Sequence, residues 1–193
     1  SEATVPLREA SLFHAVLTAI GHEPLLAFIT GAVLAWAFHS TLAVILLIAS
    51  FVANGSLELG GALAFILGLN LGGGLPAISS TLALPPAGRR LPVANLACRS
   101  IAALIGLAFI QRITGWAALL PFDAVTVALA FHAALNLVIG LFFLPLTKLV
   151  ENQVIKLVPD VKLDADQLAA PRYLDGKSLG SPSIALSNAL MET

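Results

Sequence analysis

Charged residues are scarce in this sequence. Asp, Glu, Lys and Arg make up only 11% of its 193 residues, whereas a soluble domain carries about 25%. A chain with so few charges cannot cover a folded globule with solvated groups, so we expect much of its surface to face lipid. The formal net charge of −1 also provides no basic surface for nucleic acid, and we expect no nucleic-acid partner.

Cysteine is nearly absent, and no leader segment is recognisable in the first residues. Cys98 is the single cysteine and lies in an apolar run, which excludes a disulfide framework or a cysteine-rich metal cluster and favours a packing role. Residues 1–9 contain neither an initiator methionine nor the basic and apolar regions of a signal peptide. We therefore expect the sequence to begin within a longer natural chain.

Long apolar runs are what the sequence has instead, since 58% of its residues are hydrophobic. The first run covers residues 24–53, and its only ionisable residue is His39. As one straight helix it would extend about 45 Å, beyond the roughly 30 Å of a bilayer's hydrocarbon core. Two half-length helices that meet at residues 38–41, as a re-entrant hairpin or a broken span, fit better.

A second apolar run, residues 59–84, is interrupted at residues 70–76. This segment contains three consecutive glycines followed closely by a proline, a composition that disfavours a continuous helix. Irregular backbone at membrane depth is tolerated only where protein surrounds it or where it lines a wet cavity. The interruption therefore indicates a functional site.

Two further runs, residues 91–113 and 123–147, are each long enough to span once, and a loop at residues 114–122 joins them. A basic loop at residues 85–90 precedes the first run, and Lys148 follows the second. The positive-inside rule places both basic flanks in the cytoplasm.

The two ends differ from this apolar middle. Residues 7–20 show the pattern of an amphipathic helix at the membrane interface. After Pro159 charged residues appear among Pro, Ser and Gly, as in a solvated linker, and residues 184–191 begin another helix. We predict an all-α integral membrane protein with an interfacial segment (1–23), a transmembrane region (24–150) and a cytoplasmic tail (151–193).

Paired helix breaks inside a membrane are typical of secondary transporters. Half-helix N-termini present free N–H groups to anions, and half-helix C-termini present carbonyls to cations. Hydroxyl and amide groups can hold a small anion without a fixed charge that would prevent its release. The candidate substrate-binding residues are those of the two breaks: His39, Ser40, Thr41, Asn70, Gly72, Gly73 and Gly74.

From residue 31 to about residue 145 the chain resembles one repeat, the second, of the sodium/phosphate cotransporter family. The family's Gln-Ser-Ser-Ser motif corresponds to His-Ser-Thr-Leu at residues 39–42, and its Gly-Ala-Asn-Ile-Gly-Thr-Thr motif to residues 68–74. Residues 131–136 match the family's His-x-x-x-Asn segment. Residues 171–175 resemble the linker before a PhoU-like domain in bacterial members.

Ser40, Thr41 and Asn70 coincide with polar positions of the family's motifs, so the resemblance implies that they are ligands. We expect these three residues to bind sodium as well. Several positions depart from the motifs: His39 replaces the glutamine, Leu42 a serine, and Gly73 and Gly74 both threonines. We expect the two glycines to keep backbone N–H donors available. Arg99 lies where the family often has asparagine; it could pair with an anion, or lie at the interface as a snorkelling side chain.

The resemblance implies sodium-coupled transport of inorganic phosphate or a similar small oxyanion across a bacterial inner membrane, half of an inverted-repeat transporter with sodium as the coupling ion. One repeat supplies half a site, so the other half comes from a first repeat upstream or from a second copy of the chain. The alternative is a membrane-anchored phosphate sensor with a degenerate transport site. An enzyme is not expected, because adjacent residues such as His39 and Ser40 point in different directions on a helix.

Overall fold

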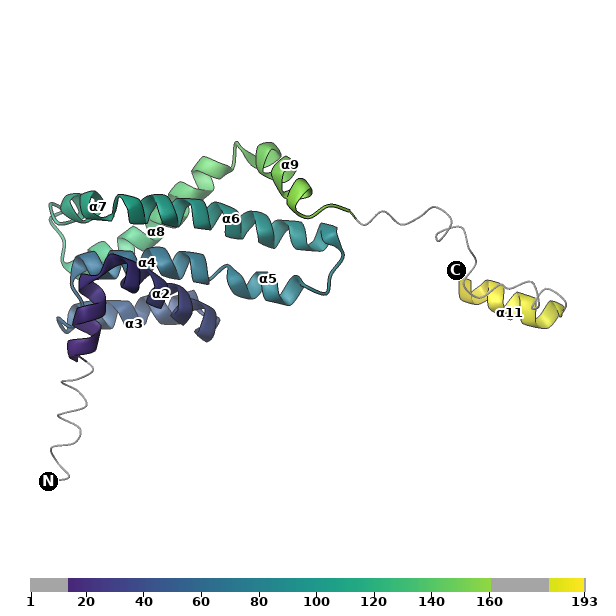
Figure 1. Ribbon diagram of the computed structural model, residues 1–193, viewed down its shortest axis with the longest axis horizontal. Coiled ribbons are helices and arrows are strands. Elements are labelled where there is room, and N and C mark those ends of the chain that lie inside the picture. The colour runs from purple at the N-terminus through teal and green to yellow at the C-terminus, as the bar shows by residue number, and fades with distance from the viewer. Residues whose placement is uncertain (1–13, 161–180, 193) are drawn as a thin grey trace, which may run out of the picture. The chain divides into compact units, whose positions relative to one another are not determined.

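The computed structural model describes residues 14–160 and 181–192, and within these ranges the secondary structure is helical, with no strand (Figure 1). Residues 1–159 and 160–193 form two separate units. The second unit contains helix α11, Pro182–Glu192, which confirms the helix predicted near residues 184–191. The predicted linker and most of the predicted interfacial segment lie outside the described residues.

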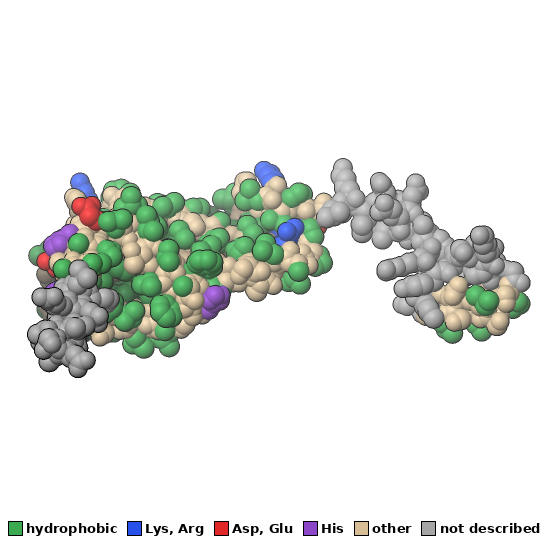
Figure 2. All heavy atoms as spheres, turned by 60° about the horizontal axis from the view of Figure 1, so that its bottom comes forward, with side chains coloured by type: hydrophobic (Ala, Val, Ile, Leu, Met, Phe, Trp, Pro, Cys, Tyr) green, Lys and Arg blue, Asp and Glu red, His purple; other side chains and the backbone are tan. Residues whose placement is uncertain are grey.

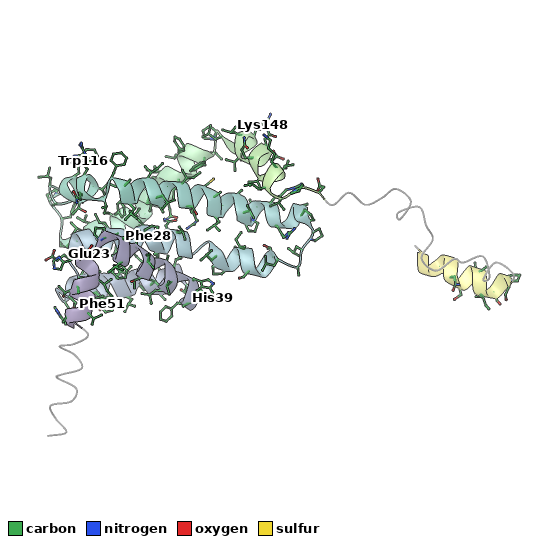
Figure 3. The ribbon with its side chains drawn as sticks, viewed as in Figure 1. Glu23, Phe28, His39, Phe51, Trp116 and Lys148 are labelled. Carbon is green, nitrogen blue, oxygen red and sulfur yellow. The ribbon has the colours of Figure 1, made fainter. Side chains whose placement is uncertain are left out.

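The first apolar run folds as a hairpin. A helix at His14–His22 bends by 116° into α2, Pro24–Phe38. His39 then adopts a left-handed conformation, with φ of 52°, and Ser40 is extended before α3, Thr41–Ala53, begins. Figure 3 shows Glu23 and Phe51 toward one end of this hairpin and His39 at the other. The predicted break at residues 38–41 is therefore confirmed, as the turn of a helical hairpin.

The second run forms α4, Leu59–Gly72, and α5, Leu75–Thr81. Gly73 and Gly74, between them, keep right-handed helical dihedral angles. The N–H of Gly73 donates to the carbonyl of Leu69 at 2.9 Å, and that of Gly74 to the carbonyl of Leu71 at 3.1 Å. The helical hydrogen bonds therefore shorten from four residues to three at this point, and they are not interrupted. The break has the predicted position but is smaller than predicted, because Pro76 lies in the first turn of α5, where a missing N–H costs no hydrogen bond.

The rest of the first unit comprises α6 (Pro86–Ala108), α7 (Ile110–Ala117), α8 (Ala124–Phe143) and α9 (Thr147–Leu157). The basic loop predicted at residues 85–90 is wrong, since proline suits a first helical position and α6 starts at Pro86. The loop predicted at residues 114–122 is shorter, because α7 reaches Ala117. Within residues 14–160 and 181–192, three segments are long and apolar enough to cross a membrane, namely Leu59–Thr81, Pro86–Ala108 and Ala124–Phe143, and a fourth follows if the bent pair counts as one span.

The closest helix contact joins α2 to α4, backbone against backbone. A Cβ atom added to Gly68 would lie 1.8 Å from the carbonyl oxygen of Phe28, and one added to Gly72 would lie 2.0 Å from that of Ala32. From the other side, a Cβ on Gly31 would lie 2.2 Å from the carbonyl oxygen of Phe65. Lipid tails are as apolar as leucine, so helices in a membrane associate through such close packing of small residues.

This contact makes α4 the central helix, with every residue from Gly61 to Asn70 buried. The outer faces of the bundle are apolar and exposed: Figure 2 shows hydrophobic side chains spread over the drawn face of this unit. Leu25 and Val33 of α2 and Leu137 and Leu141 of α8 are examples, each at least half exposed. Such a surface fits contact with lipid or with further membrane helices.

Charged residues are separated toward the two ends of the bundle (Figures 2 and 3). Glu23, Glu58 and Asp123 each immediately precede an apolar helix, α2, α4 and α8 respectively. Asp123 accepts hydrogen bonds from the hydroxyl of Thr126 at 2.6 Å and from its N–H at 3.0 Å, and these bonds lower the pKa of Asp123. A carboxylate is stabilised at a helix N-terminus. The end of the bundle at which α2, α4 and α8 begin is therefore its acidic end.

We predict that Gly68→Ala strongly destabilises the protein, whereas Gly115→Ala does not. A methyl group on Gly68 would overlap the Phe28 carbonyl, and backbone there cannot move without separating α2 from α4. Gly115 has nothing within 4 Å of the same added atom. Overpacking a core costs typically 1–3 kcal/mol, and we expect a loss of at least about 3 kcal/mol here because the obstacle is backbone. Thermal unfolding of both purified variants measures the difference; equal melting temperatures would refute the contact.

Candidate functional site

The two helix breaks predicted from the sequence meet in the structure. Thr41, the first residue of α3, lies against Gly73 at the junction of α4 and α5: a Cβ on Gly73 would be 2.4 Å from the Thr41 methyl carbon. The tip of the α2–α3 hairpin therefore packs on the second interruption. Asn70 lies one helical turn before Gly73 and is fully buried. Thr41, Gly73 and Asn70, three of the seven residues predicted from the sequence, therefore lie close together, and we call this group the hairpin-tip site.

The hydroxyl groups of this site are held by local structure. The Ser40 oxygen accepts a hydrogen bond from the N–H of Ala43 at 3.2 Å, so Ser40 caps the N-terminus of α3. Its own proton is still free to be donated to a ligand. Thr41 is half-buried. The hydroxyls of Ser79, Ser80 and Thr81 instead bond to carbonyls of their own helix, which is the structural role that Ser and Thr often take in helices.

His39 lies at the outer end of the hairpin, where its side chain is exposed (Figure 3). Its Nδ1 atom is 3.2 Å from the carbonyl oxygen of Ala37, two residues earlier in the chain. A non-glycine residue in the left-handed conformation is uncommon and often marks a tight turn. The role of His39 as a ligand stays a prediction, and its observed role is to make the turn.

The glycines do not provide the free donors that the sequence suggested. The N–H groups of Gly73 and Gly74 are both used within the α4–α5 turn, so the expectation that they remain available is wrong. Gly72 packs against the backbone of Ala32, which leaves no room for a ligand. The glycines serve close approach instead, since a larger residue would push the hairpin away from α4.

Arg99 connects two helices through its side chain, from α6 to Asn70 of α4. Its Nη1 atom donates to the Asn70 side-chain oxygen at 2.7 Å and to the Asn70 carbonyl at 3.3 Å. Its Nε atom donates to the Asn95 side-chain oxygen at 3.2 Å. The interfacial, snorkelling placement weighed from the sequence is wrong. At 1.5 Å per residue, Arg99 is roughly 20 Å from Pro86 and roughly 14 Å from Ala108 along α6, and it points to α4.

Two buried side-chain nitrogens lack a hydrogen-bond partner among the described residues: Nδ2 of Asn70, the residue that Arg99 contacts, and Nδ1 of His132. His132 lies on α8. Asn136 does not reach this cluster, because its amide bonds to the carbonyl of His132 in its own helix at 2.8 Å. Buried donors without partners are rare in folded proteins and each requires an explanation.

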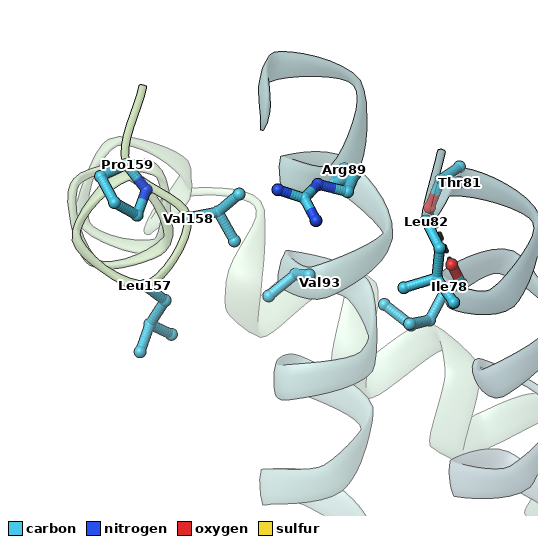
Figure 4. A pocket seen from close by; sticks show the side chains of 8 residues that line it. All are labelled: Ile78, Thr81, Leu82, Arg89, Val93, Leu157, Val158 and Pro159. Atoms are coloured by element: carbon cyan, nitrogen blue, oxygen red, sulfur yellow. Dashed lines mark hydrogen bonds between the residues drawn. The ribbon is translucent and has the colours of Figure 1, made fainter. Parts of the chain in front are cut away.

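A separate cleft of about 190 Å³ lies at the basic end of the bundle (Figure 4). Its walls are largely apolar and come from α5, α6 and the segment after α9; they include Ile78, Leu82, Arg89 and Val158. Nearby, Arg90 donates from Nε to the carbonyl of Val158 at 3.1 Å, which ties α6 to the end of α9. This cleft shares no residue with the hairpin-tip site.

Comparison with known proteins places these observations in a family. The pattern of the Na+/Pi-cotransporter family matches residues 8–153. The chain belongs to this family. The match covers the hairpin, the central helix and Arg99, so the site described above lies wholly within the family's region.

Relatives are longer than this chain. Escherichia coli K12 has the "Putative inorganic phosphate export protein YjbB", 29% identical over 192 residues, which are 100% of this chain and 35% of the relative. The protein of the same name in Salmonella typhimurium is 28% identical over 191 residues, 99% of this chain and 35% of its own length. YqeW of Bacillus subtilis is 28% identical over 133 residues, 69% of this chain and 43% of the relative. No solved structure matches the chain significantly.

We predict that Gly73→Ala destabilises the protein and that Thr41→Ser restores much of the loss. The added methyl collides with the Thr41 methyl carbon, which serine lacks, so the double variant relieves the overlap. A thermal-unfolding cycle of wild type, both single variants and the double variant measures the coupling, and we expect about 1 kcal/mol or more. Additive effects of the two substitutions would show that the hairpin tip does not touch the α4–α5 junction.

Proposed function

We propose that this chain is one half of a secondary transporter that carries inorganic phosphate, or a similar small oxyanion, together with sodium. The observation that carries the proposal is the contact between the hairpin tip and the α4–α5 junction, beside the buried Asn70 and between helices long enough to span a membrane. Membership of the Na+/Pi-cotransporter family supports the choice of phosphate and argues against an enzyme.

The hairpin supplies opposite partial charges at one point. The N-terminus of α3, capped by Ser40, directs its positive end and the Ser40 hydroxyl at the tip. The C-terminus of α2 ends at the same tip with its carbonyl oxygens. A phosphate that loses its hydration shell needs such donors, and a sodium ion needs such oxygens. Ser40, Thr41 and Asn70 are the residues through which this half would contact the two ions.

The second half of the site has to come from elsewhere. The chain spans 35% of the length of the YjbB relatives, and its bundle has broad exposed apolar faces. We propose that an upstream repeat, or a second copy of this chain, covers the face beside the hairpin tip and completes the site. The two halves would then move relative to each other around bound phosphate, as in alternating access.

We expect proteoliposomes that contain the full-length protein to accumulate radiolabelled phosphate when a sodium gradient is imposed. Ser40→Ala should weaken uptake several-fold, because it removes a hydroxyl and the α3 cap, whose loss costs about 1 kcal/mol. Ser79→Ala is the matched control, since that hydroxyl bonds only to its own helix. Uptake that is unchanged when choline replaces sodium would overturn the coupling. Phosphate binding without any flux would overturn transport and favour a sensor.

The charge distribution supports an orientation, with the basic end of the bundle and the tail in the cytoplasm of the bacterium's inner membrane. Arg89 and Arg90 start α6, and Lys148 and Lys156 lie on α9, while Glu23, Glu58 and Asp123 mark the other end. Among the described Lys and Arg residues, Arg112 lies toward the acidic end and Arg99 lies within α6. Basic residues that flank spans remain in the cytoplasm.

Cysteine labelling tests this orientation. In a Cys98→Ser background, we expect Ser183→Cys on α11 to react with a membrane-impermeant maleimide only in inverted membrane vesicles. Asn54→Cys, at the exposed turn after α3, should react from the opposite side and serves as the matched control. The reverse labelling pattern would contradict the orientation.

A further inference from the structure

Arg99 is half-buried on the side of α6 that contacts α4, and no Asp or Glu of the described residues forms an ion pair with it. Its three hydrogen-bond acceptors are the side-chain oxygens of Asn70 and Asn95 and the carbonyl of Asn70, all neutral. The sequence contains no Asp or Glu between Glu58 and Asp123, and none within α2, α3 or α8. Within the described residues, the hydrogen-bond partners of Arg99 are therefore all neutral dipoles. Ionisable groups inside membrane spans are costly and usually belong to functional sites.

The groups around Arg99 are those that would bind an anion. A guanidinium only donates hydrogen bonds, so the Asn70 oxygen must face it and the Asn70 Nδ2 atom must point elsewhere. That nitrogen is buried and makes no hydrogen bond among the described residues. The Nδ1 atom of His132 on α8 is likewise buried without a partner among the described residues. Within the described chain, Nη2 of Arg99 also makes no hydrogen bond, so Arg99 and Asn70 together hold one positive charge and unused N–H donors on both side chains.

The groups that accept hydrogen bonds from Arg99 come from two helices: Asn95 from α6 itself and Asn70 from α4. Asn70 connects this cluster to the hairpin-tip site, because it lies one helical turn from Gly73, which contacts Thr41. Arg99 is therefore part of the wall behind the tip of the hairpin. A structural link between α4 and α6 would need only a neutral side chain at this position, since both of its partners are amides.

We propose that Arg99 is a fixed cationic subsite for the transported oxyanion, oriented by its hydrogen bonds to Asn70. The proposal rests on the function proposed above and adds to it the source of the charge. The permanent positive charge of Arg99 compensates the anion in this half, where the hydroxyl ligands are few. A bound sodium ion is then not needed to balance the charge of the anion at this position. Sodium would instead bind to the oxygen atoms of the hairpin-tip site that do not contact Arg99.

Two variants separate this role from a structural one. Arg99→Gln removes the charge, and we expect phosphate to bind the full-length protein about tenfold more weakly or worse, because charge-assisted hydrogen bonds are lost. Asn70→Asp keeps the hydrogen bond to Arg99 and gives the guanidinium an internal counter-ion. We expect this variant to fold at least as stably as wild type and to lose phosphate binding. Arg112→Gln, an exposed arginine on α7, is the control and should bind normally.

The measurement is equilibrium binding of radiolabelled phosphate to full-length protein in nanodiscs, in sodium and in choline buffer, with thermal unfolding to confirm folding. Chemical modification of wild-type protein gives an independent readout: phosphate should slow the reaction of Arg99, and not of Arg112, with phenylglyoxal. The protection measurement tests the subsite even if Arg99→Gln fails to fold, because it uses wild-type protein. Retained binding in Asn70→Asp and Arg99→Gln, or no protection of Arg99, would overturn the subsite.

The two proposals fail in different ways. If wild-type protein transports phosphate and the Arg99 variants bind it normally, the subsite is wrong and the function stands. If no phosphate is transported, but sulfate protects Arg99 of the wild-type protein and Arg99→Gln abolishes sulfate binding, the subsite stands and the phosphate assignment is wrong. If neither anion binds wild-type protein, both are wrong.

Discussion

The contact of α2 with α4 determines the rest of this structure. Gly31, Gly68 and Gly72 have no side chain, and the two backbones approach until carbonyl oxygens occupy the positions where Cβ atoms would lie. In a membrane the helices gain little from excluding water, so contact over a wide surface has to supply the attraction. With α2 fixed against α4, the length of α2 decides where the hairpin turns. The turn at His39 and Ser40 then falls beside the α4–α5 junction.

Burial of α4 on all sides has a second consequence. Asn70 has no exposed surface, so its polar atoms must find partners within the protein. Arg99 satisfies its oxygen and its carbonyl, which brings a positive charge to the middle of α6. The amide nitrogen is left without a partner among the described residues. A bundle of otherwise apolar helices thus carries its polar groups at one depth, beside the tip of a helical hairpin, as expected for a binding site in a membrane transporter.

Carboxylates are absent from the interior of this bundle and present at the starts of three helices. At these positions the helix dipole stabilises a negative charge, while within the span it would pair with Arg99 and neutralise it. The placement of the carboxylates at the helix starts therefore explains both the acidic end of the bundle and the lack of a counter-ion beside Arg99. The family's match over residues 8–153 covers both features.

The sequence by itself determined the membrane character, the all-α fold, the hairpin turn at residues 38–41 and the position of the second interruption. These follow from composition and from local backbone preferences, which act over a few residues. The sequence-based prediction of an open break at Gly73 and Gly74 was too large, because glycine permits a break but equally permits a helix. The prediction of a loop at Arg89 and Arg90 was wrong, since both lie in α6. Only the tertiary structure decided that Thr41 contacts Gly73, that the glycine N–H groups are occupied and that Arg99 bonds to Asn70. Those facts depend on how helices distant in the sequence pack together, and no local pattern encodes that packing.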